Sequence, residues 1–148
     1  MPRSVLLLLT TAYLALLGWM TLGPQPLDSG GRGALESIIE YLSGFEALAW
    51  ITYDVVEFLA NIALFVPAGV LFVLLLGRGR WWLALCLAIA LSGAIEALQL
   101  LLPERVPDLR DLAANSLGAV IGLVVAVVAL RAASQRTTDR TRPVQPVP

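Results

Sequence analysis

Seven polar residues lie in or beside the long apolar runs of this sequence, and they are its best candidates for binding or chemistry. They are Asn61, Glu96, Gln99, Arg105, Asp108, Asp111 and Asn115. Ionisable residues at such places are costly to bury, so they are functional candidates by default. Glu96 and Gln99 are three residues apart and share one face of a helix. The last three members of the set follow the spacing i, i+3, i+7 and can share a face in the same way.

Three kinds of role fit this set. An arginine can meet a phosphate or carboxylate through two parallel hydrogen bonds, so Arg105, oriented by Glu96 and two of the amides, predicts a site for an anionic head group. The carboxylates of Asp108 and Asp111 could instead hold Mg²⁺ or Ca²⁺, although the interposed arginines weaken cation binding. In the third role the set is a hydrogen-bonded network that only ties helix ends together.

The elements that must position these residues are membrane helices. Of the 148 residues, 58% are hydrophobic and 14% are charged, whereas soluble domains carry about 25% charged residues. A membrane span takes about 20 mostly apolar residues, and four runs qualify, at about 5–22, 55–76, 81–102 and 112–130. We therefore predict an all-α, polytopic membrane protein, a bundle of four transmembrane helices that forms one domain over residues 1–131.

Two segments outside the spans have patterns of their own. Residues 132–148 are rich in Ser, Thr, Gln, Arg and Pro, a composition typical of a disordered tail. Between the first two spans, apolar residues recur at helical spacing beside acidic ones, which predicts a short amphipathic helix along the membrane interface. Those apolar residues are Leu35, Ile38, Ile39 and Leu42. The pattern does not indicate what the 23–54 loop does.

The distribution of arginine predicts the orientation, because basic residues are retained on the cytoplasmic side of a membrane. All ten basic residues are arginines, and with four spans seven of them fall on the side of the termini and three on the other. Both termini and the tail are therefore predicted to be cytoplasmic. The loops 23–54 and 103–111, and with them the seven polar residues, are predicted at the outer face of a bacterial inner membrane.

Several classes of function are excluded or disfavoured. The chain has no histidine and a single cysteine, Cys86, which excludes intrachain disulfides, zinc sites of the Cys/His kind and histidine acid–base catalysis. A net charge of −1 without a basic, aromatic-rich patch argues against nucleic acid as a partner. We expect no cofactor and no resident metal, and a non-enzymatic role is favoured.

Small residues predict where the helices pack. Gly118 and Gly122 form a GxxxG pattern in the fourth span, which predicts close approach of a neighbouring helix. Pro67 and Gly69 in the second span are interpreted as helix-packing or kink positions rather than as parts of a ligand site.

The polar and small residues together resemble the ordered signature of the VanZ-like membrane proteins. That signature runs through Asn61-Ile-Ala-Leu-Phe-Val-Pro67-Ala-Gly69, Glu96-Ala-Leu-Gln99, Arg105, Asp108, Asp111, Asn115-Ser-Leu-Gly118 and Gly122. The resemblance implies a bacterial cell-membrane protein of the cell envelope. The family's namesake confers low-level resistance to the glycopeptide teicoplanin, so an effect on glycopeptide susceptibility is also implied.

The main hypothesis is an envelope protein that binds an anionic lipid or a lipid-linked cell-wall precursor through its head group at the outer leaflet. One alternative is a membrane-embedded enzyme acting on a lipid-linked phosphate. The other is a non-catalytic scaffold, in which case its partners are other membrane proteins as well as the bilayer.

Overall fold

The computed structural model describes residues 2–23, 29–102 and 108–140 of the chain. Within these ranges every regular element is helical, which confirms the predicted all-α class. The elements are α1 (Arg3–Leu22), α2 (Ser29–Ser43), the 3-10 turn η1 (Glu46–Leu48), α3 (Tyr53–Leu76), the 3-10 turn η2 (Arg78–Arg80), α4 (Trp81–Gln99) and α5 (Leu109–Arg140).

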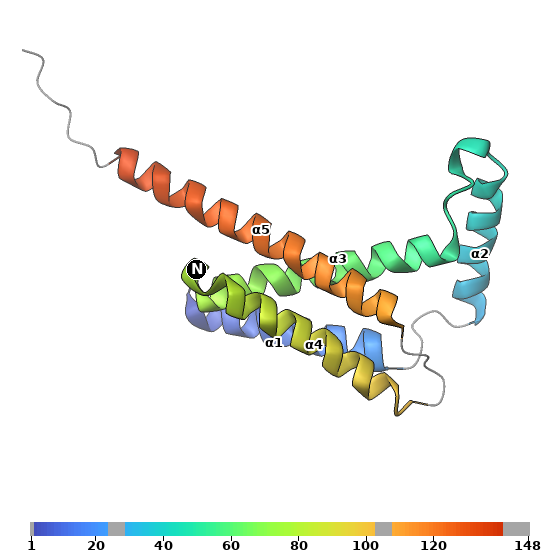
Figure 1. The fold of residues 1–148 in the computed structure, drawn as a ribbon, viewed down its shortest axis with the longest axis horizontal. Helices are drawn as coiled ribbons and strands as arrows, with labels where there is room; N and C mark the ends of the chain where they lie inside the picture. Colours follow the sequence, from blue (N-terminus) through green and yellow to red (C-terminus); the bar gives the residue numbers. More distant parts are fainter. Residues whose placement is uncertain (1, 24–28, 103–107, 141–148) are drawn as a thin grey trace, which may run out of the picture.

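Four of these helices, α1, α3, α4 and α5, are long and apolar enough to cross a membrane, which confirms the four predicted spans. They run in alternating directions, so the start of α1 and the far end of α5 lie at the same end of the bundle (Figure 1). We call the opposite end the loop end; there α1 and α4 finish and α3 and α5 begin. Which side of the membrane the loop end faces stays a prediction from the arginines.

Helix α5 is longer than its apolar run. It begins at Leu109 and continues to Arg140, although hydropathy predicts a span ending at residue 130 and an unstructured tail from residue 132. The difference has a simple cause, because hydropathy detects the membrane core whereas a formed helix extends through any residues that favour it. Ala132, Ala133 and Gln135 are such residues. Residues 141–148, the rest of the predicted tail, lie outside the described residues.

The seam between α3 and α5 is the most extensive helix contact and is lined by glycines. A Cβ atom on Gly118 would overlap the carbonyl oxygen of Ile62, and one on Gly122 would overlap that of Val66. From the other side, a Cβ on Gly69 would overlap the carbonyl oxygen of Ala119. The two backbones therefore touch at three levels, an approach that only residues without a side chain permit.

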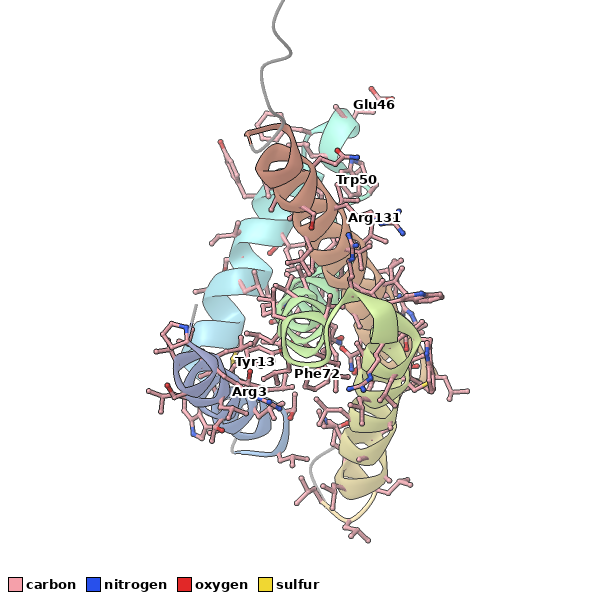
Figure 2. The ribbon with its side chains drawn as sticks, turned by 90° about the vertical axis from the view of Figure 1, so that its left-hand side faces the viewer. Arg3, Tyr13, Glu46, Trp50, Phe72 and Arg131 are labelled. Carbon is pink, nitrogen blue, oxygen red and sulfur yellow. The ribbon has the colours of Figure 1, made fainter. Side chains whose placement is uncertain are left out.

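Helix α1 is attached to this seam through a polar contact beside a proline. Pro67 lies within α3 and its side chain is exposed. Because proline has no N–H, it makes no hydrogen bond to the carbonyl oxygen of Ala63, four residues earlier. The Tyr13 hydroxyl of α1 donates to the Leu64 carbonyl oxygen at 2.6 Å. Tyr13 stands on the side of α1 that faces α3 (Figure 2), so this hydrogen bond fixes α1 near the proline.

The connections are short where the bundle needs them to be. Thr52 caps α3, its hydroxyl oxygen accepting from the N–H of Val55 at 3.3 Å. The turn from α3 to α4 passes through Gly77 at a φ of +82°, a conformation that favours glycine.

Helix α2 lies across the loop end rather than along the bundle (Figure 1), and Trp50 beyond it projects away from the bundle (Figure 2). This arrangement agrees with a helix that lies in the membrane plane.

Candidate functional site

The helices bring the predicted polar residues together near the loop end. Asn61 of α3 donates from Nδ2 to Oδ1 of Asp111 of α5 at 2.7 Å. These residues are 50 positions apart in the sequence, and the close contact of α3 and α5 at the glycines just below them brings the two helices near enough for this bond. The hydrogen bond therefore depends on the packing of α3 against α5.

One turn deeper, α4 and α5 are joined by a fully internal hydrogen bond. Nδ2 of Asn115 donates to the hydroxyl oxygen of Ser92 at 2.9 Å. Both side chains are buried, with 4% of Asn115 and 0% of Ser92 exposed. Sequence reasoning missed Ser92, although a signal was present, because it is a small polar residue one helical turn before Glu96.

Glu96 extends this α4–α5 contact towards the loop end. Its carboxylate lies near enough to the backbone N–H of Asp108 to interact with it, and near enough to the carboxylates of Asp108 and Asp111 to feel their charge. Ser92 and Glu96 on α4 thus face Asn115 and the first turn of α5 in antiparallel order. We call this line of contacts the polar seam: Ser92, Glu96, Asp108, Asp111 and Asn115.

Gln99 has a different partner from the one that its spacing suggests. Its Nε2 donates to the backbone carbonyl oxygen of Thr21 in α1 at 3.0 Å, and 9% of the residue is exposed. Gln99 therefore connects α4 to α1 at the loop end instead of extending the polar seam. A backbone acceptor of this kind leaves no trace in the sequence.

The arginine that the structure describes at this end faces outward. Nη1 of Arg110 lies 3.5 Å from Oδ2 of Asp54, and the two side chains are 58% and 66% exposed. The N–H of Arg110 also receives a cap, because Oδ1 of Asp108 accepts from it at 2.8 Å. An exposed ion pair of this kind contributes little to stability, so Arg110 stands at the rim of the site. Arg105 lies outside the described residues, and its predicted role as an anion-binding fork is untested.

Two buried acceptor atoms in the polar seam have no hydrogen-bond partner among the described residues. They are Oε2 of Glu96 and Oδ1 of Asn115. An unsatisfied buried acceptor costs roughly 1–3 kcal/mol, and such atoms are rare enough in folded proteins that each needs a reason. The polar seam is therefore a network with two open positions.

The carboxylates do not form a cation cage. Among residues 2–23, 29–102 and 108–140, no group of three or more Asp, Glu, His or Cys residues is arranged to hold a metal ion.

Comparison with known proteins was made by family, by curated sequence and by solved structure. The model of the family described as VanZ/LLP1 matches residues 10–130, a range that begins within α1, takes in α3, α4 and most of α5, and contains the whole polar seam. This match confirms the resemblance seen in the sequence. No curated protein and no solved structure gave a significant match.

Proposed function

Because the chain belongs to the VanZ/LLP1 family and has four helices able to cross a bilayer, we propose that it binds the phosphate-bearing head group of an anionic lipid or a lipid-linked cell-wall precursor. The binding position is the polar seam at the loop end. The observation that carries the proposal is the pair of buried, unpartnered acceptors on Glu96 and Asn115, since a head group can supply the missing donors.

The place of the seam supports a lipid as the ligand. Glu96 is partly exposed, whereas Asn115 one layer below is buried, so the open acceptors lie just beneath the surface of the bundle. They lie near helix ends, the level at which lipid head groups meet a membrane protein. Arg110 stands at the rim, and the sequence places Arg105 in the same loop. Guanidinium groups at that level suit a phosphate.

The arginine distribution predicts that the loop end faces outward in a bacterial cell membrane, where lipid-linked wall precursors and glycopeptide antibiotics meet. An effect on teicoplanin susceptibility is part of the proposal for that reason.

The scaffold alternative is weakened by one observation: both glycines of the GxxxG pattern already pack against α3 of the same chain. They are not free to hold a partner protein.

The test is native mass spectrometry of the gently extracted full chain, with melting temperatures measured in parallel. We expect one retained phosphate-bearing lipid per chain, lost in Glu96→Gln and in Arg105→Lys while both variants melt close to the unmodified protein. Glu40→Gln is the matched control, because Glu40 is an exposed residue of α2 and the chemical change is the same.

The outcomes separate binding from scaffolding. If each loss of lipid is accompanied by an equal loss of thermal stability, the polar seam is a helix-end network and the proposal fails. Variants that melt normally but do not restore teicoplanin tolerance in a strain lacking the protein would extend the proposal to that phenotype. If those variants restore normal teicoplanin tolerance, an effect on teicoplanin susceptibility is no longer part of the proposal.

A further inference from the structure

We propose that the head group bound by the polar seam carries a primary ammonium group, which donates to Oε2 of Glu96 and Oδ1 of Asn115. This inference rests on the proposed function and narrows it: the head group keeps its phosphate, but with an ammonium beside the phosphate it is zwitterionic, so the site selects the ammonium and not the net negative charge of the lipid. It is carried by the kind of atoms left open, by the charge around them, and by their spacing along the two helices.

The open atoms are both acceptors. Oε2 of Glu96 and Oδ1 of Asn115 have no donor among the described residues, whereas the amide nitrogen of Asn115 is already used on Ser92. An ammonium group has three N–H donors and no acceptor, so it satisfies both atoms without introducing a new unsatisfied one. A phosphate oxygen has no proton to give and would face these acceptors unfavourably. The phosphate therefore belongs at the rim.

The charge around the seam favours a cation. Glu96, Asp108 and Asp111 lie within electrostatic range of one another. Arg110 is exposed and turned to Asp54. Asn61 and Arg110 offset part of the repulsion at Asp111, and a neutral hydroxyl could donate to the same acceptors but would not reduce the repulsion any further. An ammonium reduces that repulsion as well as donating.

The spacing of the acceptors suits one small group. Glu96 is one turn from Ser92 on α4, and Ser92 receives the Asn115 hydrogen bond, so the two open acceptors occupy neighbouring layers of the seam. Residues one turn apart on a helix are about 5.4 Å apart along its axis, so one ammonium with bonds of about 2.8 Å to each acceptor is small enough to serve side chains from neighbouring turns. A quaternary trimethylammonium has no N–H and cannot make these bonds.

The experiment compares phospholipids that differ only in the head group. The full chain is reconstituted in nanodiscs or mixed micelles with phosphatidylethanolamine, phosphatidylcholine or phosphatidylglycerol, and bound lipid is counted by native mass spectrometry. We expect phosphatidylethanolamine to be retained about tenfold over the other two, equivalent to the gain of roughly one good hydrogen bond. In Glu96→Gln the preference should fall to about twofold or less, while Glu40→Gln keeps it.

A second arm needs no variant and remains valid if Glu96→Gln does not fold. Soluble glycerophosphoethanolamine and glycerophosphocholine are added as competitors to the unmodified protein. Displacement of lipid by the former alone supports the ammonium, and displacement at equal molar amounts shows that the site reads the head group without its acyl chains. Retention of a lipid with no difference between the ethanolamine and choline forms overturns this inference and leaves head-group binding intact. Absence of any retained lipid overturns both.

Discussion

Replacing Gly122 by alanine should separate α3 from α5 and lower the stability of the bundle. The added Cβ would overlap the carbonyl oxygen of Val66, a backbone atom that cannot rotate away. Overpacking of this kind costs about 1–3 kcal/mol, while alanine gains about 0.5–1 kcal/mol over glycine within a helix. The net expectation is a loss of about 0–2.5 kcal/mol, the difference of those two ranges.

Gly93→Ala is the matched control, because a Cβ at Gly93 of α4 meets nothing within 4 Å. The control should gain the helix propensity without any clash, so the two variants should differ by the packing cost alone, about 1–3 kcal/mol. The assay is unfolding of the purified protein by SDS in mixed micelles, followed by helical circular dichroism. If Gly122→Ala and Gly93→Ala unfold at the same SDS fraction, the close seam between α3 and α5 does not exist as described.

Three other expectations follow from the same structure. Asn61→Leu leaves the carboxylate of Asp111 without its hydrogen-bond donor and should lower the free energy of unfolding by roughly 1–3 kcal/mol. Arg110→Gln at the exposed rim should lower it by less than about 1 kcal/mol. If Arg110→Gln is the more destabilising variant in SDS unfolding, the burial assigned to these two residues is contradicted. Tyr13→Phe removes one hydrogen bond and should cost about 1 kcal/mol without changing lipid retention, and a change in retention would place α1 in the site. Reporter fusions after Arg131 should behave as cytoplasmic and fusions near Gly30 as external, and an external C-terminus would remove the outer-leaflet placement.

The spans could be predicted closely because hydropathy alone determines them. Helix α3 begins two residues before the predicted residue 55, and α4 ends at Gln99 instead of residue 102. The last three residues of that run, Leu100 to Leu102, are apolar but precede a proline in the sequence, which disfavours helix just before it. Hydropathy cannot register such a stop. The early start of α5 has a local cause too, since the Asp108 side chain caps its first turn.

The candidate site was only half predictable. Helical spacing correctly grouped residues by face, but pairing across helices depends on which helices touch, and that is decided by glycines on α3 and α5. Ser92 could have been found from its place one helical turn before Glu96, whereas the Thr21 carbonyl oxygen could not, because a backbone acceptor carries no signal in the sequence. Arg110 faces Asp54 at the rim, a choice of rotamer that the sequence does not encode.

The close seam between α3 and α5 has a consequence for how the protein is made. The ribosome delivers helices in order, and α4 separates these two partners along the chain. After α3 and α4 have entered the bilayer, Gly69 still lacks Ala119 and Asn61 still lacks Asp111, since both partners lie on the helix that is synthesised last. Until α5 is synthesised, the first two thirds of the chain therefore remain in the membrane as an incomplete set of spans. Only the arrival of α5 joins them into one bundle, and with it the polar seam is completed.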